Sequence, residues 1–239
     1  MNPILYRIPF SHYCQKVEWA FTHAGIPYDA IDISLIKMPR LPKVTRDGTV
    51  PILEVDGVLI EGSGAIMAWI AEACPELDWY PEGALEWEQQ MDAEMGPVAR
   101  REAYRVAHGD PFHFNVPFLQ RLMLRAVRPI LLNVMKYYKV RRYDEEDRLA
   151  RARLTKDIAA QLGNKPLLFG AAPSAADFAT AALARPLLYV ADARGYEGED
   201  WQRVEQYVLR LKPESTSVDK SRKIREKDWK RLEALASRY

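Results

Sequence analysis

The chain has 239 residues, of which 48% are hydrophobic and 28% are charged, and this composition is typical of a folded protein and not of a disordered one. Its 34 Lys and Arg against 33 Asp and Glu give a net charge of +1, so any binding to nucleic acid or acidic lipid would require a local basic patch. A chain of this length is long enough for two domains.

The apolar and cysteine content indicates a cellular compartment. No run approaches the ~20 apolar residues of a membrane span, and the opening residues lack the long apolar stretch of a secretory signal. The two cysteines, Cys14 and Cys74, are too few for a disulfide framework, and no nearby His gives them the spacing of a zinc site. We therefore expect a cytoplasmic protein with no membrane span and no metal.

The first third of the chain alternates short strand-like runs with helical ones. The expected strands cover residues 4–8, 28–33, 50–55 and 58–60, and the expected helices cover residues 13–24 and 63–73. A helical connection predicts that the first two strands are parallel, and the turn signal Asp56-Gly57 predicts that the last two are antiparallel. With a short helix between the second and third strands, the order is β-α-β-α-β-β-α, a thioredoxin-like α/β domain over residues 1–76.

Strand signals stop near residue 81, and the rest of the chain is expected to form an all-α domain over residues 84–239. The expected helices cover residues 84–108, 118–139, 141–162 and 174–189, with a kink or break at Gly96-Pro97 and a bend near Pro129. Ser174 and Asp177 fit a box that caps the start of the last of these helices.

A basic tail ends the expected helical domain. Residues 218–239 carry eight Lys or Arg and four Asp or Glu, with apolar residues spaced as in an imperfect amphipathic helix. Three interpretations stay open: the tail caps the helical domain, covers a substrate cleft, or binds the acidic surface of a partner.

The segment between the first strand and the first helix is the most informative for chemistry. Ser11 and Cys14 lie where free amides and the helix dipole stabilise an anion. Ser11 could donate a hydrogen bond to the sulfur of a bound thiolate, or Cys14 could itself be a nucleophile. The alternative interpretation is purely structural, with Ser11 as a helix cap and Cys14 in the core.

Two further motifs follow along the chain. Pro51 opens a strand and can be cis, which would leave the backbone of Val50 free to pair with an extended, peptide-like ligand, although an ordinary edge-strand proline has the same sequence. Ser63 begins a helix after the hairpin, where its hydroxyl and the free amides suit a carboxylate or simply cap the helix.

Taken in order, four segments of the chain resemble motifs of the glutathione transferase superfamily, in its serine- and cysteine-type classes. They are residues 11–17, 50–53, 63–66 and 174–177. The resemblance covers nearly the whole chain and implies a thioredoxin-like N-terminal domain followed by an all-helical one. It also implies glutathione as a co-substrate and a homodimer.

The resemblance assigns roles to individual residues. Ser11 would activate the glutathione thiol with Tyr13 in support, Val50 and Pro51 would bind the cysteinyl backbone, and Ser63 would bind the γ-glutamyl carboxylate. Candidates for the glycyl carboxylate are Lys37, Arg40 and Lys43.

One departure from the family pattern concerns the γ-glutamyl amine. The residue before the matched serine is Gly62, where the family usually has an acidic residue or Gln, and Glu61 lies one position early. Unless Glu61 reaches round to the amine, loss of a charge-assisted hydrogen bond should weaken glutathione binding by about ten- to a hundredfold.

The second substrate is expected between the domains, against the start of the helical half. The candidate lining residues are Arg101, Tyr104, Phe112 and His113. The aromatic content of this region favours a hydrophobic or aromatic electrophile.

The leading hypothesis is therefore a glutathione transferase, with a role in detoxification, that conjugates or reductively cleaves such an electrophile. One alternative is a noncatalytic protein-interaction module with the same fold. A second is a glutathione-dependent thiol transferase that uses Cys14, which the serine at position 11 disfavours because dithiol enzymes resembling this family have a cysteine there.

Overall fold

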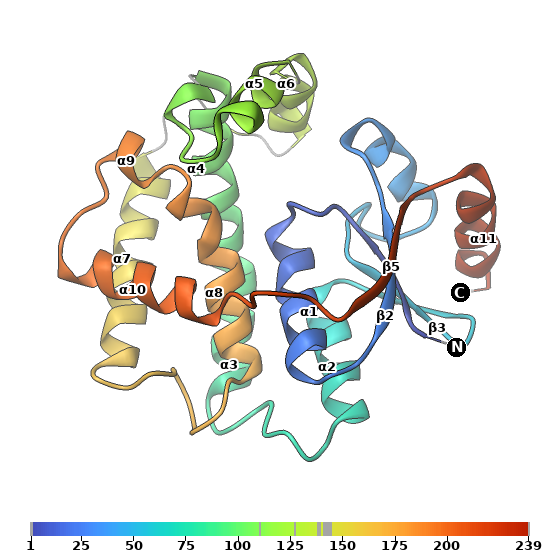
Figure 1. The fold of residues 1–239 in the computed structure, drawn as a ribbon, viewed down its shortest axis with the longest axis horizontal. Helices are drawn as coiled ribbons and strands as arrows, with labels where there is room; N and C mark the ends of the chain where they lie inside the picture. Colours follow the sequence, from blue (N-terminus) through green and yellow to red (C-terminus); the bar gives the residue numbers. More distant parts are fainter. Residues whose placement is uncertain (1, 110, 127, 138–139, 141–144, 239) are drawn as a thin grey trace. The chain divides into compact units, whose positions relative to one another are not determined.

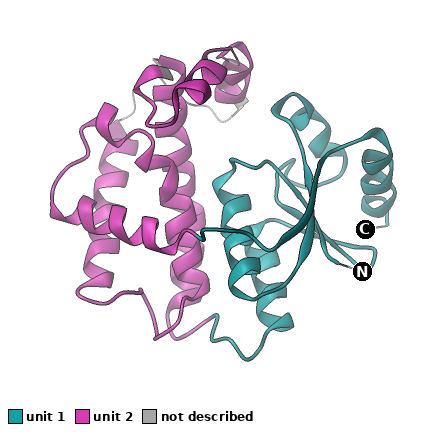
Figure 2. Ribbon diagram, in the orientation of Figure 1, with its two compact units in different colours: residues 1–79, 213–239 teal, residues 80–212 magenta. Residues whose placement is uncertain are grey.

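The computed structural model describes residues 2–109, 111–126, 128–137, 140 and 145–238. The chain divides into two compact units (Figure 2). Unit 1 comprises residues 1–79 and 213–239, and unit 2 comprises residues 80–212.

Unit 1 is built on a five-stranded mixed sheet with the order β4-β3-β1-β2-β5 (Figure 1). The strands are β1 (Ile4–Arg7), β2 (Tyr28–Asp32), β3 (Ile52–Val55), β4 (Val58–Glu61) and β5 (Val218–Lys223). The pair β1 and β2 is parallel and the hairpin β3 and β4 is antiparallel, so both predictions are confirmed.

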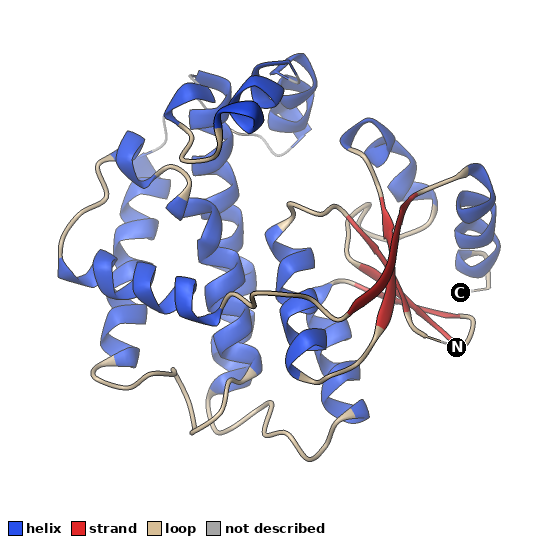
Figure 3. Cartoon of the chain, viewed as in Figure 1, coloured by secondary structure: helices blue, strands red, loops and turns tan. Residues whose placement is uncertain are grey.

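Helices cover both faces of this sheet (Figure 3). Helices α1 (His12–His23) and α2 (Ser63–Ala73) lie on one face, where the rings of Phe21 and Trp69 are 6.1 Å apart. Helix α11 (Glu226–Ala236) lies on the other face. The 3₁₀ segment η1 (Leu35–Lys43) contributes Leu41 to the same apolar cluster as the Trp229 side chain of α11.

The C-terminal segment differs from the prediction that it ends the helical domain. Residues 213–239 belong to unit 1, where β5 pairs in parallel with β2 and extends the sheet from four strands to five. Ile224, Trp229 and Leu232 are buried in the cluster with Leu41. The segment and η1 thus both contribute apolar side chains to the cluster on that face of the sheet.

Unit 2 consists of helices. They are α3 (Ala84–Gln90), the π-helical η2 (Met91–Met95), α4 (Gly96–Gly109), the 3₁₀ turn η3 (Pro111–His113), α5 (Phe118–Ala126), α6 (Arg128–Tyr137), α7 (Glu145–Leu162), α8 (Ala175–Leu188), α9 (Ala191–Arg194) and α10 (Glu199–Leu211). The buried α8 starts with the expected box, in which Asp177 accepts hydrogen bonds of 2.9 and 2.7 Å from the amide and hydroxyl of Ser174. The Tyr207 hydroxyl donates to the same carboxylate at 2.7 Å.

Two prolines each lie in the first turn of a helix. Pro97, which has no amide to donate, falls in the first turn of α4, directly after the wider turn of η2, where the sequence predicts a kink or break. Helices α5 and α6 both lie within the helix expected over residues 118–139, with residue 127 between them outside the described part of the chain, and Pro129 is the second residue of α6. Residues 138–139 and 141–144 of the expected helices lie outside the described part of the chain.

Candidate functional site

The three sequence motifs of unit 1 meet at one end of its sheet. In the antiparallel pairing of β1 with β3, Tyr6 lies opposite Ile52, so the residues that follow β1 and those that precede β3 reach the same edge. Ile52 in turn lies opposite Glu61, the last residue of β4, so the start of α2 reaches that edge as well. A hydrogen bond of 3.0 Å from the Gly62 amide to the Pro51 carbonyl joins two of the motifs directly.

Ser11 is the N-cap of α1, as its position after the first strand predicts. Its amide donates to the Ile8 carbonyl at 2.9 Å, and its carbonyl accepts from the Gln15 amide at 2.9 Å. The half-buried hydroxyl makes no capping hydrogen bond to the helix. Backbone bonds thus hold Ser11 in place and leave its hydroxyl uncommitted to capping.

The peptide bond between Val50 and Pro51 is cis, the isomer that the resemblance implies and that the residues themselves leave open. Pro51 is buried directly before β3, and Val50 is half-buried beside it.

The start of α2 places Ser63 as the first helical residue, with only 7% of its surface exposed. Gly62 before it has φ +85°, a conformation that residues with a Cβ rarely adopt. The Glu61 carboxylate accepts a hydrogen bond of 2.9 Å from the Arg46 amide. The Glu61 carboxylate therefore binds the backbone of the loop before β3. Gly62 has no side chain that could take the place of an acidic residue at this position.

The C-terminal segment holds two of the three cations that were candidates for the glycyl carboxylate. Lys37 donates to the Ile224 carbonyl at 3.1 Å. Arg40 binds Glu226 through two hydrogen bonds of 2.8 and 3.1 Å and lies 4.6 Å from the centre of the Trp229 ring. Lys43 is exposed at the end of η1 and is the candidate that remains. The sequence contains no local signal of these contacts.

The side chains next to Ser11 have structural surroundings. Cys14 is a free thiol with no exposed surface, and burial raises its pKa to about 12, even though hydrogen bonds from the Ile8 backbone and Ser11 favour the thiolate. His12 is buried, and its ring lies 4.7 Å from that of the half-buried Tyr13. The environment of Cys14 disfavours its use as a nucleophile near neutral pH.

In unit 2 the candidate lining residues separate into two groups. Arg101 donates to both carboxylate oxygens of Asp147, at 3.0 and 2.9 Å, and Tyr104 packs against the cluster that contains Leu131. Phe112 and His113 instead line cavities. Both residues line one cavity of about 450 Å³, and His113 also lines a second cavity of about 580 Å³. The structure therefore does not bring the four candidates together.

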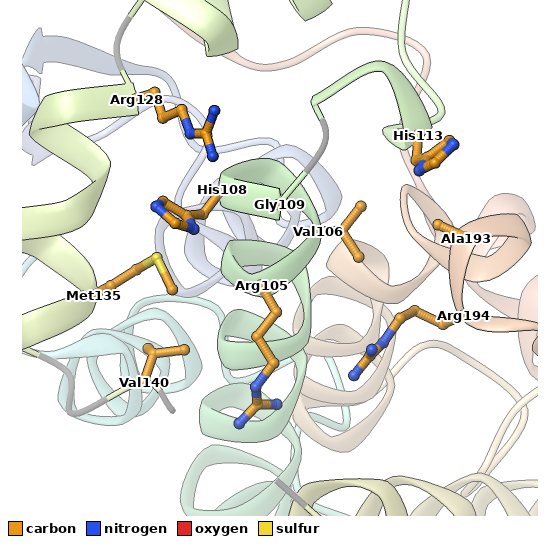
Figure 4. A pocket seen from close by; sticks show the side chains of 10 residues that line it. All are labelled: Arg105, Val106, His108, Gly109, His113, Arg128, Met135, Val140, Ala193 and Arg194. Atoms are coloured by element: carbon orange, nitrogen blue, oxygen red, sulfur yellow. The ribbon is translucent and has the colours of Figure 1, made fainter. Parts of the chain in front are cut away.

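The larger cavity has a strongly basic lining (Figure 4). Figure 4 shows Arg128, Met135 and Val140 on one side of α4, and His113, Ala193 and Arg194 on the other. The remaining lining residues, Arg105, Val106, His108 and Gly109, belong to α4 itself.

Buried carboxylates balance part of that positive charge. Burial raises the pKa of Asp147, but hydrogen bonds and charges from Arg101 and Arg105 outweigh it and hold the pKa below its ordinary value. For Glu102, likewise, burial is outweighed by Arg194, Tyr196 and Arg105, and its pKa is also lowered. These ion pairs join α4 to α7 and α9 within unit 2.

Within the described residues, no group of three or more His, Cys, Asp or Glu side chains could hold a metal ion. No helix in this part of the chain is long and apolar enough to cross a membrane.

Comparison with known proteins identifies the fold. Residues 5–77 match the family model of the glutathione S-transferase N-terminal domain. Among solved structures, poplar glutathione transferase F1 is similar over 100% of both chains, with a TM-score of 0.63 and 17% identity. A glutathione transferase family member from Pseudomonas fluorescens, solved with two glutathione bound, matches over 87% of both chains at a TM-score of 0.62 and 17% identity. No curated protein sequence matches the chain.

Residues 5–77 therefore match the glutathione S-transferase N-terminal domain family, and the fold of the chain is that of solved glutathione transferases. The resemblance in the sequence motifs is confirmed at this level, as is the thioredoxin-like fold class.

Proposed function

We propose that this protein is a glutathione transferase of the serine type, in which Ser11 activates the glutathione thiol. In this proposal Val50 binds the cysteinyl backbone, Ser63 binds the γ-glutamyl carboxylate, and Lys43 supplies positive charge for the glycyl carboxylate. The fold and the glutathione-bound structure from Pseudomonas fluorescens support glutathione as the ligand.

The observation that carries the proposal is the convergence of the three motifs at one edge of the sheet. The first residues of α1 and α2 follow Ser11 and Gly62, and both helices lack an acidic residue in the first turn. Free amides and helix dipoles at such N-termini stabilise a thiolate and a carboxylate. Two anionic groups of one extended peptide-like ligand therefore find suitable partners on adjacent segments.

The chemistry follows from the Ser11 hydroxyl, which donates a hydrogen bond to the sulfur and stabilises the thiolate over the thiol. The thiol proton passes to solvent, the thiolate forms a bond to an electrophilic carbon, and the leaving group departs with the electron pair of its broken bond. Each unit by which the thiol pKa falls toward neutral pH gives about tenfold more thiolate.

The second substrate in this proposal is a hydrophobic or aromatic electrophile that contacts Phe112 and His113. Both side chains line the smaller cavity of unit 2. If this is correct, Phe112→Ala should raise the KM for an aromatic electrophile and leave the KM for glutathione unchanged.

Calorimetric titration with glutathione and turnover of a dinitroaryl chloride test the proposal together. We expect Ser11→Ala to lower kcat by about 10²-fold or more, the usual effect of removing one preorganised donor, and to change the glutathione Kd less than threefold (~0.6 kcal/mol). Ser34→Ala is the matched control, because Ser34 is exposed and caps η1 without a side-chain hydrogen bond. Unchanged turnover in Ser11→Ala would remove Ser11 from the mechanism.

A second candidate function, a noncatalytic interaction module, is favoured by a different observation. Gly62 has no side chain for the γ-glutamyl amine, Glu61 binds the Arg46 backbone, and the C-terminal segment occupies Lys37 and Arg40. Absence of heat with millimolar glutathione would favour this candidate over the enzyme. Rapid alkylation of Cys14 near neutral pH would instead revive the thiol transferase, which its burial disfavours.

A further inference from the structure

Helix α5 of unit 2 leaves its apolar side chains uncovered. None of its nine residues is buried, and the exposed fractions are 70% for Phe118, 68% for Leu119 and 61% for Met123. With Leu122, these side chains recur at positions i, i+1, i+4 and i+5, which places them on one face of the helix. Figure 1 shows α5 beside α6 at one end of unit 2.

This apolar face differs from the other exposed apolar residues of unit 2. Leu85, Leu132, Leu149 and Leu209 are also exposed but lie singly on α3, α6, α7 and α10, as is usual on protein surfaces. Four adjacent large side chains on one short helix form a contiguous patch, and such patches mark interaction sites.

Along the chain, the charge next to the patch is positive, although Asp192 of α9 lines the smaller cavity together with Phe112 and Arg121. Between Asp110 and Asp144 the sequence has seven Lys or Arg and no acidic residue. In the described part of this stretch, Arg125, Arg128 and Lys136 are exposed. The Arg125 guanidinium lies 5.9 Å from the ring centre of Phe112, and that ring is 6.4 Å from the ring of Phe118. Cations therefore border the apolar face directly.

We propose that α5 binds to the surface of a membrane that contains anionic lipids. The surface involved, named here the α5 patch, comprises Phe118, Leu119, Leu122, Met123, Arg125 and Arg128. Apolar side chains on one helix face would enter the boundary between headgroups and acyl chains, and the arginines would contact the anionic headgroups.

Exposure and charge favour a lipid surface. The large apolar side chains of α5 are all exposed and have arginines next to them, as on helices that lie at the boundary between headgroups and acyl chains. The local run of positive charge supplies the basic patch that the overall net charge of +1 does not reveal. At nine residues, α5 is far shorter than a membrane span, so binding would be peripheral.

Vesicle flotation of the full chain tests the proposal. We expect binding to vesicles of phosphatidylcholine mixed with phosphatidylglycerol, little binding to phosphatidylcholine alone, and weaker binding at high salt. Each cation at a surface is worth about fivefold in partitioning, so Arg125→Gln with Arg128→Gln should weaken binding by about 25-fold. Phe118→Ser with Met123→Ser should also abolish most of the binding.

Matched controls lie outside the patch. Lys156→Gln with Lys227→Gln removes two exposed charges elsewhere, and Leu149→Ser removes an exposed apolar side chain of α7; both should leave flotation unchanged. Circular dichroism checks that each variant is folded. Failure to float with anionic vesicles, or equal loss in patch and control variants, would overturn the proposal. So would a change of oligomeric state in the Phe118→Ser, Met123→Ser variant without any change in flotation.

Discussion

Replacement of Trp229 tests whether the C-terminal segment is an integral part of unit 1. Trp229 has no exposed surface and lies in the cluster that also contains Tyr6, Ile31 and Leu41. Truncation of a buried tryptophan to alanine costs about 3–5 kcal/mol, because apolar contacts are lost and a cavity remains. Since a typical domain is stable by about 5–15 kcal/mol, Trp229→Ala should remove a large share of the free energy of unfolding.

A second variant separates lost packing from lost polar contacts. Among the described residues, the Trp229 indole N–H is buried without a hydrogen-bond partner. Trp229→Phe therefore loses some contact area but also removes an unsatisfied donor, which costs about 1–3 kcal/mol when buried. We expect these effects largely to offset each other and the stability to stay within about 1 kcal/mol of the parent chain.

Urea unfolding followed by circular dichroism, with amide hydrogen exchange of β1 and β2, measures the effect on unit 1. At a slope of about 2 kcal/mol per M urea, Trp229→Ala should lower the unfolding midpoint by roughly 2 M. Leu209→Ala, at a side chain that is 58% exposed on α10, should shift it little. If Trp229→Ala unfolds like Leu209→Ala and β2 keeps its exchange protection, the C-terminal segment is an appendage and not an integral part of unit 1.

Two further predictions concern titratable groups. In a Cys74→Ser variant, Cys14 should resist iodoacetamide near neutral pH until urea is added, because burial raises its pKa to about 12; rapid labelling of the folded protein would contradict this. Asp147→Asn should destabilise unit 2 by about 3–5 kcal/mol, since it removes the buried carboxylate that pairs with both Arg101 and Arg105, whereas Asp157→Asn, in an exposed pair, should cost less than about 1 kcal/mol. Because the pKa of Asp147 is lowered in the folded state, the stabilisation of unit 2 by this carboxylate should be complete above about pH 4, the pKa of the unfolded chain. It should be lost as the pH falls through the lower pKa of the folded state. Equal acid sensitivity of wild type and Asp147→Asn would refute this.

The sequence predicted those parts of the fold that depend on local patterns. Alternating and helical spacing of apolar residues indicated the first four strands, α1 and α2, since each element buries one face of its own. Asp56-Gly57 indicated the hairpin, and the Ser174 to Asp177 spacing indicated the start of α8, because turns and caps are formed by residues close in the chain. The same local signals placed Ser11, Val50 and Ser63 next to strand ends.

Only the tertiary structure decided which distant segments these elements meet. Strand β5 has a single apolar residue, Val218, and joins the sheet through backbone hydrogen bonds that leave no pattern in the side chains. Arg40 looks like an available cation in the sequence, yet its partner Glu226 lies 186 residues away. The sequence determines the charge of each side chain, but tertiary packing determines which partner that side chain binds. Here the packing of α11 over the sheet determines which cations near the candidate glutathione site already have partners.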